Sequence, residues 1–177
     1  MSALTSVQRQ YILHWGEMGT RWGINRTVAQ IHALLYLSPK PLAAEEIAQT
    51  LNVARSNVST SIRELESWGL VRPLHVLGER REQYESMKDV WEMFRVIVDQ
   101  RKRREVDPTA QLLRRCLEEL EQEDTRDVYT RDRLKDMIEF FEVATAAYEE
   151  ITLISPHALR GILKMRGKIR KLLRPRQ

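Results

Sequence analysis

The 177-residue sequence contains little glycine and proline, with 7 and 6 residues, which argues against a loop-rich all-β fold and against a disordered chain. A single cysteine, Cys116, excludes an intramolecular disulfide and fits a reducing compartment. No apolar run approaches the roughly 18 residues of a membrane-spanning helix. The first ten residues lack the apolar core of a signal peptide. We therefore expect a cytoplasmic protein with no membrane partner.

The sequence also lacks the motifs of common catalytic and metal sites. Its four histidines, His14, His32, His75 and His157, have no cysteine or carboxylate at metal-ligand spacing. No glycine-rich phosphate loop, serine nucleophile elbow or zinc-protease motif is present. We therefore expect no metal, no cofactor and no enzymatic activity.

Charged residues, by contrast, are abundant. They make up 31% of the chain, which is typical of long solvated helices. The net charge of +4 and the sequence pI of about 9.4 are compatible with nucleic-acid binding. Residues 155–177 carry eight basic residues and no acid, whereas acids dominate residues 118–150. The basic tail is explained equally well as a solvated helix face.

Hydrophobic periodicity and helix-capping residues predict a mostly helical chain. An asparagine cap at Asn25 and a stop at Gly69 bound the best-defined set of helices. After Gly69 the period changes to that of strands, and Gly78-Glu79 is typical of a hairpin turn. In the later helix at 89–104, Val90, Phe94 and Ile97 are expected on one side. The predicted helices are 6–18, 26–37, 43–51, 55–68, 89–104, 107–121, 127–154 and one from 155, and the strands are 70–77 and 80–85.

The order of these elements from 25 to 85 is that of a winged helix-turn-helix, with a small β-hairpin as its wing. A helix enters a major groove, and the hairpin reaches the flanking backbone or minor groove. On a helical wheel of 55–68, Val58, Ile62 and Leu65 share the inner face. Small side chains on the outer face allow close approach to DNA, although an ordinary amphipathic surface helix is the alternative. The outer residues are Ser56, Ser59, Thr60, Arg63 and Ser67.

Particular motifs give this segment a family resemblance. They are Pro41-Leu42-Ala43-Ala44-Glu45-Glu46-Ile47-Ala48, Arg55-Ser56-Asn57-Val58-Ser59, Arg63-Glu64-Leu65-Glu66-Ser67-Trp68-Gly69-Leu70-Val71, the wing at 78–84, and upstream Trp15-Gly16 with Trp22-Gly23-Ile24-Asn25-Arg26-Thr27. Residues 25–85 resemble the winged-helix domain of MarR-type transcriptional regulators, most closely the GbsR-like branch. From 107 onward, only helices are shared. Ala54 departs from the serine cap of the family, which costs about 1 kcal/mol unless Asn52 compensates or the helix starts later.

The resemblance implies a homodimeric transcriptional regulator, most simply a repressor, on an inverted-repeat operator. It implies an N-terminal dimerisation helix at 1–24, a DNA-binding domain at 25–86, and a helical linker, dimerisation region and basic tail at 87–177. Arg80 is expected to project from the wing into the minor groove, while Tyr84 points back to the domain. The expected DNA contacts are Arg55, Ser56, Asn57, Ser59, Thr60, Arg63, Arg80 and Arg81.

Two further sets of residues are candidates for dimerisation and for an effector. A heptad pattern in 127–154 predicts a dimerisation seam. The resemblance implies an aromatic pocket for a small-molecule effector such as a quaternary ammonium, although core packing also explains the rings. Cys116, among leucines, is interpreted as a buried hydrophobe, with a redox sensor as the alternative. The seam residues are Leu134, Met137, Phe141, Ala144, Tyr148 and Ile151, and the pocket residues are Tyr11, Trp15, Trp22, Tyr36 and Trp91.

The charge of the winged segment motivates a rival function. Residues 42–86 contain five arginines against seven glutamates. DNA binding then requires the arginines to gather on one face, with help from the basic run 101–104 or from the tail. The alternative is a winged-helix adaptor that binds proteins and does not bind DNA.

Overall fold

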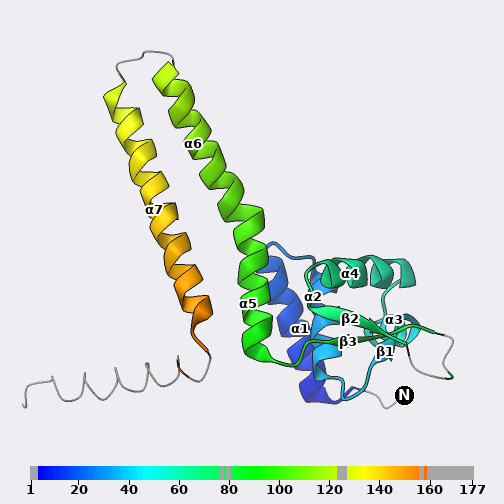
Figure 1. Cartoon of the computed structure of the whole chain (residues 1–177). Coiled ribbons are helices and arrows are strands. Elements are labelled where there is room, and N and C mark those ends of the chain that lie inside the picture. The colour runs from blue at the N-terminus through cyan, green and yellow to red at the C-terminus, as the bar shows by residue number, and fades with distance from the viewer. Residues whose placement is uncertain (1–3, 76–77, 79–80, 123–126, 156–157, 159–177) are drawn as a thin grey trace, which may run out of the picture. The chain divides into compact units, whose positions relative to one another are not determined.

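The computed structural model contains two compact units, unit 1 from Met1 to Ile97 and unit 2 from Val98 to Gln177 (Figure 1). The residues that the structure describes are 4–75, 78, 81–122, 127–155 and 158. They are mostly helical, with one small antiparallel sheet, so the predicted fold class is confirmed. No helix among the described residues is both long enough and apolar enough to cross a membrane.

Unit 1 holds the predicted winged helix-turn-helix. The Asn25 side chain caps α2 by accepting from the Thr27 N–H over 2.8 Å, as predicted. Gly69, with φ of 75°, follows the last turn of α4. The elements are α1 Ser6–Arg21, α2 Arg26–Leu37, β1 Leu42–Ala43, α3 Ala44–Leu51, α4 Arg55–Ser67, β2 Val71–Leu74, β3 Gln83–Ser86 and α5 Val90–Arg101, whose last residues belong to unit 2.

The sheet has one strand more than the sequence predicts. Its order is β1-β3-β2, and both pairings are antiparallel. Tyr84 of β3 lies opposite Leu42 on one side and Pro73 on the other. Proline is tolerated there because β2 is an edge strand. The sequence did not reveal β1 because two residues are too few to show a strand period.

Helices α1 and α2 cross at unusually short range. A Cβ added at Gly16 would lie 2.7 Å from Cγ of Gln30, and one at Gly19 would lie 2.5 Å from Cβ of Ala29. Only glycine leaves room for this approach. The predicted end of the first helix at 18 is therefore wrong, because α1 continues through this contact to Arg21.

The core of unit 1 lies between its helices and the sheet. Its buried side chains come from α1, α2, α3, α4, the sheet and the start of α5. Met93 of α5 is 7% exposed, and Val96 and Ile97 pack against the same cluster. Val90 and Phe94, which the sequence places on one side with Ile97, are 51% and 59% exposed, so that side as a whole does not pack into the core. The helix instead packs against the core through residues 93, 96 and 97. Residues 96 and 97 follow 93 by three and four positions, so all three lie on one face.

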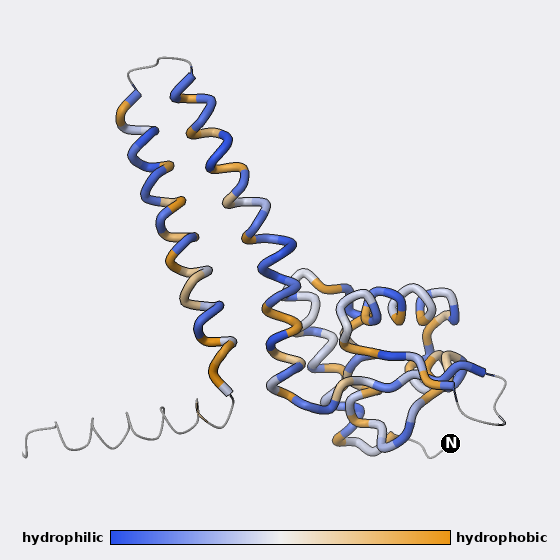
Figure 2. The backbone as a smooth tube through the Cα atoms, in the orientation of Figure 1, coloured by the Kyte–Doolittle hydropathy of each residue, from blue (hydrophilic) through white to orange (hydrophobic). Residues whose placement is uncertain are grey.

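Unit 2 is a helical hairpin. After α5 come the π-helical turn η1 (Lys102–Val106), α6 (Asp107–Gln122) and α7 (Val128–Leu153), which packs along α6. The predicted break between the helices at 89–104 and 107–121 is wrong, because η1 joins α5 to α6 and Asp107 is helical, with φ of −61° and ψ of −44°. Pro108 has no N–H to donate and its ring crowds the preceding turn, so the helix widens there. Figure 2 shows polar and apolar residues alternating along α6 and α7.

Candidate nucleic-acid interface

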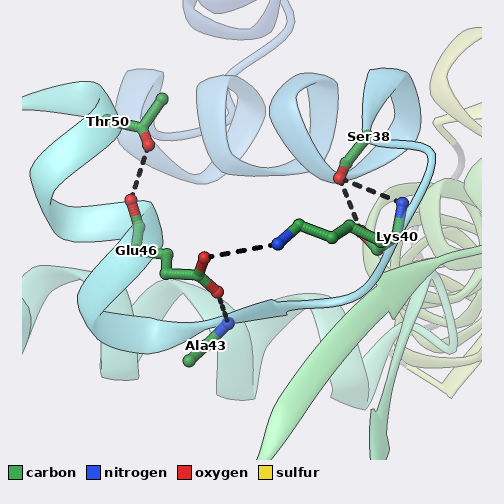
Figure 3. A network of polar contacts seen from close by, with 5 residues as sticks. All are labelled: Ser38, Lys40, Ala43, Glu46 and Thr50. Carbon is green, nitrogen blue, oxygen red and sulfur yellow. Dashed lines mark hydrogen bonds and ion pairs between the residues drawn. The ribbon is translucent and has the colours of Figure 1, made fainter. Parts of the chain in front are cut away.

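A small polar network fixes the start of α3 (Figure 3). The Ala43 N–H donates to Oε2 of Glu46 over 3.0 Å, and Lys40 Nζ lies 3.8 Å from Oε1 of the same carboxylate. The Thr50 hydroxyl donates to the Glu46 carbonyl over 2.6 Å, and the Ser38 hydroxyl donates to the Lys40 carbonyl over 2.5 Å. Glu46 therefore ties the turn after α2 to the first turn of α3, where Ala43 offers no side-chain cap.

The turn between α3 and α4 is tight. Asn52, with φ of 53° and ψ of 50°, ends α3 in the left-handed region, and its N–H donates to the Ala48 carbonyl. Helix α4 begins at Arg55, after Ala54, whose side chain makes no capping hydrogen bond. Asn52 thus serves as the C-terminal cap of α3, and α4 does not start later than predicted.

Helix α4 divides into the two faces that its sequence predicts. Val58, Ile62 and Leu65 are at most 2% exposed and belong to the core cluster. Ser61, which the wheel did not single out, is also buried. The opposite face is exposed and small. Its exposed residues are the predicted DNA contacts Arg55, Ser56, Asn57, Ser59, Thr60 and Arg63, together with Ser67.

The arginines around α4 differ in their partners. Arg55 pairs with Glu45 of α3 over 2.8 Å, and Arg72 pairs with Glu85 across the sheet. Arg63 instead donates to the Ser59 carbonyl over 3.4 Å and contacts the Thr60 hydroxyl at 3.5 Å. No carboxylate lies within ion-pair distance of Arg63 in the part of the chain that the structure describes. The charge of Arg63 is therefore the one on this face most available to a phosphate or a base edge.

The base of the wing is anchored as predicted. Tyr84 is half-buried against the core cluster, and its hydroxyl donates to Glu82 over 2.6 Å. Burial first, and then the bond to Glu82, raise the pKa of the Tyr84 phenol well above its usual value. Arg81 is exposed at the start of the returning segment. Arg80 lies outside the described residues, so its place on the wing stays a prediction.

Three residues of the basic run 101–104 pair with carboxylates of unit 2. Lys102 donates to Asp107 over 2.9 Å, and this bond is the main reason that its pKa is raised. Arg101 lies 3.2 Å from Glu105, and Arg103 lies 3.0 Å from Asp99. The run thus offers less free charge to DNA than its sequence suggests. Most of the basic tail, from 159 to 177, lies outside the described residues.

Two of the five predicted pocket residues, Trp15 and Trp22, line a cavity of about 30 Å³ in unit 1. A space of this size holds a water molecule. Tyr11 stacks on Trp15 with ring centroids 5.6 Å apart. Tyr36 and Trp91 do not line the cavity. Its other lining residues are Met18, Gly19, Ile24, Val28, Ala29, His32, Leu65, Trp68, Leu70 and Ile97.

His32 is a buried residue of this cavity that sequence reasoning passed over. It is 4% exposed, and its Nε2 atom has no hydrogen-bond partner among the described residues. Burial, and secondarily the nearby ammonium of Lys88, lower the pKa of His32 to about 4. The signal was present, since His32 follows Val28 by one turn on the inner face of α2. The imidazole is therefore neutral at physiological pH.

Lys88 closes the end of α2. Its Nζ donates to the carbonyls of Leu35, Tyr36 and Ser38 over 2.7, 2.9 and 2.9 Å. It also lies 5.9 Å from the centroid of the Tyr36 ring. A helix C-terminus with free carbonyls favours a cation at this position. The lysine thereby links the segment after the sheet to the helix that precedes it.

The residues predicted as one dimerisation seam separate into two faces of α7. One set is half-buried on the face along which α6 packs, and the other set is exposed. The two sets lie about 60° apart around the helix, because each residue turns it by about 100°. The half-buried residues are Leu134, Phe141 and Tyr148, and the exposed ones are Met137, Ala144 and Ile151. Their role in dimerisation stays a prediction.

Among the described residues, we find no arrangement of side chains suited to chemistry other than binding. No three His, Cys, Asp or Glu side chains among them are grouped so that they could hold a metal ion. Cys116 is half-buried on α6.

Comparisons with known proteins agree with this geometry. Residues 22–82 match the model of the MarR family, and no curated protein matches the chain. The crystal structure of a transcriptional regulator is 22% identical, covers 81% of this chain and 99% of that chain, and has a TM-score of 0.53. The transcriptional regulator Tm0710 from Thermotoga maritima is 14% identical, with coverages of 84% and 96% and a TM-score of 0.39. MepR, a transcription regulator of the Staphylococcus aureus efflux pump MepA, is 12% identical, with coverages of 95% and 93% and a TM-score of 0.36.

Proposed function

We propose that this chain is a MarR-type, DNA-binding transcriptional regulator that reads DNA with α4. The observation that carries the proposal is the exposed face of α4. It consists of small hydroxyl and amide side chains with Arg63, which has no carboxylate partner in the described part of the chain. The family match over residues 22–82 supports the same function. Short polar side chains let the helix approach base edges closely in a major groove.

The acidic balance of the winged segment is compatible with this function. Arg55 pairs with Glu45, but its side chain is 70% exposed. An exposed ion pair contributes about 0–1 kcal/mol, so a phosphate can replace the glutamate at little cost. Arg63 has no carboxylate partner among the described residues that a phosphate would have to replace. Arg80 and Arg81 are proposed to add contacts from the wing to the adjacent minor groove.

The proposed regulator acts as a homodimer on a pseudo-palindromic operator, because a two-fold protein reads a two-fold site. Repression is proposed because blocking a promoter needs no contact with polymerase. The GbsR-like branch is proposed from the motifs alone. Exposed apolar residues on α7, Phe140 at 62% and Ile151 at 53% among them, support self-association.

A small-molecule effector is proposed to bind at the aromatic cavity of unit 1. Trp15 and Trp22 offer ring faces to a cation. A space of about 30 Å³ holds only water, so an effector must displace side chains to enter. Titration with a quaternary ammonium such as betaine is expected to change tryptophan fluorescence and to weaken operator binding. If neither the fluorescence nor the operator binding changes, the proposed effector site is contradicted.

A gel-shift titration with the DNA upstream of the gene tests the central proposal. We expect tight binding that weakens steeply with salt and exceeds binding to random DNA. Arg63→Ala should weaken binding by about 1–3 kcal/mol and relax sequence preference. Arg115→Ala removes the same charge from the exposed surface of α6 and should leave binding unchanged. Comparing Arg80→Ala with Arg81→Ala shows which of the two arginines contributes to DNA binding.

The second candidate is an adaptor that binds proteins through the winged domain. The excess of glutamate over arginine in residues 42–86 favours it. No preference for the upstream DNA over random DNA, together with no effect of Arg63→Ala, would support the adaptor and contradict the regulator.

A further inference from the structure

Helix α7 has a second apolar face that none of the described residues of unit 2 covers. Phe140 is 62% exposed and Met137 is 47% exposed, and Ala144 and Ala147 beside them are exposed as well. These four residues follow one another at steps of three, four and three, which places them on one stripe of the helix. We call this stripe the outer face of α7. Phe141, by contrast, is half-buried on the face along which α6 packs.

The described part of unit 2 has little burial of its own. No residue of α6 or α7 is buried. Two helices packed along a single seam leave most of their apolar surface in water, so a hairpin of this kind needs a further helix layer. The outer face is the surface on α7 that offers such a layer a continuous apolar contact.

The order of side-chain sizes on the outer face identifies the partner. Two bulky residues, Met137 and Phe140, are followed by two small ones, Ala144 and Ala147. When the same stripe runs in the opposite direction, Phe140 meets Ala144 and Met137 meets Ala147, so every layer pairs a large side chain with a small one. A parallel pairing would stack large on large and small on small, and the helix spacing would have to change along the seam.

We propose that the outer face of α7 pairs antiparallel with the outer face of a second copy of this chain. Phe140 of one copy then covers Ala144 of the other, and Met137 covers Ala147, about a two-fold axis between residues 140 and 144. In this register Ile151 lies opposite Arg133, whose guanidinium pairs with Asp136 over 2.8 Å and leaves its aliphatic stem to cover the isoleucine. Two hairpins joined this way form a four-helix layer. The inference deepens the proposed homodimer by naming its seam and register.

Disulfide crosslinking of the full-length protein tests the register. In a Cys116→Ser background, Met137→Cys protein and Ala147→Cys protein are mixed, one of them carrying a size tag, and oxidised. We expect the mixed dimer to crosslink in high yield. Met137→Cys alone should crosslink at least tenfold less, because its two copies are separated by ten residues, or about 15 Å, along the antiparallel helices.

Two crosslinking outcomes would overturn the proposal. Efficient crosslinking of Met137→Cys with itself would show a parallel pair. Crosslinking of Phe140→Cys with Ile151→Cys, but not of Met137→Cys with Ala147→Cys, would show an antiparallel pair in another register.

The oligomeric state provides a second readout. Phe140→Asp should raise the dimer dissociation constant at least tenfold in sedimentation, with helix content preserved in far-UV circular dichroism. A dimer of unchanged affinity would place the interface elsewhere. The gel shift is scored separately, so crosslinks without DNA binding refute only the regulator, and DNA binding without crosslinks refutes only the seam.

Discussion

The two units of the chain are stabilised in different ways. All sixteen buried apolar side chains lie in unit 1, between Ile12 and Met93, whereas no described residue of unit 2 is buried. Burial of apolar surface is the main source of folding free energy. Unit 1 therefore carries an apolar core of its own, whereas the described residues of unit 2 form none.

The ion pairs of unit 2 do not replace the stabilisation that buried apolar side chains give to unit 1. Arg114 of α6 and Glu142 of α7 lie 3.0 Å apart, with side chains 49% and 56% exposed. Pairs as exposed as these are worth about 0–1 kcal/mol each. Four substitutions test how the two units are stabilised, in order of decreasing expected effect.

The largest effect is expected from Ile31→Ala, which creates a cavity in the core of unit 1. Ile31 is 0% exposed, so the loss should be about 2–5 kcal/mol of the free energy of unfolding. Tryptophan fluorescence during urea unfolding measures it, since all four tryptophans lie in unit 1. Ile151→Ala, at a residue 53% exposed, should leave that transition unchanged. Similar losses in both variants would contradict the contrast.

A pH effect of about 3 kcal/mol is expected in unit 1 alone, from His32. Burial lowers its folded-state pKa to about 4, below the ordinary value of 6.5. The folded state therefore favours neutral imidazole, so the stability is fully present above pH 6.5 and is lost as pH falls toward 4. The difference in unfolding free energy between wild type and His32→Leu, measured across that range, isolates this residue. A constant difference would show that His32 does not titrate as proposed.

Adjacent phenylalanines test the two faces of α7. Phe141→Asp puts a charge into the α6 and α7 contact and should destabilise the hairpin by about 1–3 kcal/mol at any protein concentration. Phe140→Asp should have no such effect in dilute protein, because its ring is already 62% exposed. Thermal melts followed by circular dichroism at low concentration compare the two. Equal melting of both variants would show that α7 is not oriented as described.

The smallest effect is expected where Lys88 closes α2. Lys88→Met removes three hydrogen bonds to helix carbonyls and should cost about 1–2 kcal/mol. Lys40→Met is the control, because Lys40 is 69% exposed and 3.8 Å from its partner Glu46. Urea unfolding of the two variants measures the difference, and an equal cost would mean that the Lys88 bonds contribute no more than a surface pair.

Sequence patterns predicted the local elements of the site well. The buried stripe of α4 at Val58, Ile62 and Leu65 followed from helical spacing, and the cap at Asn25 followed from residue type. Tyr84 was correctly predicted to anchor the wing. At Val90 and Phe94 the helical period did not show which residues of the helix would pack against the core, because that depends on neighbours distant in sequence.

The sequence by itself determined the order of the elements, their caps and the polarity of each helix face, because these depend on residues three or four positions apart. Only the tertiary structure decided which apolar stripe of α7 meets α6, that Gly19 lies against Ala29, and that Lys88 reaches back to Leu35. These contacts join residues distant in sequence. Their geometry follows from how the helices pack together, and a local sequence pattern does not specify that packing.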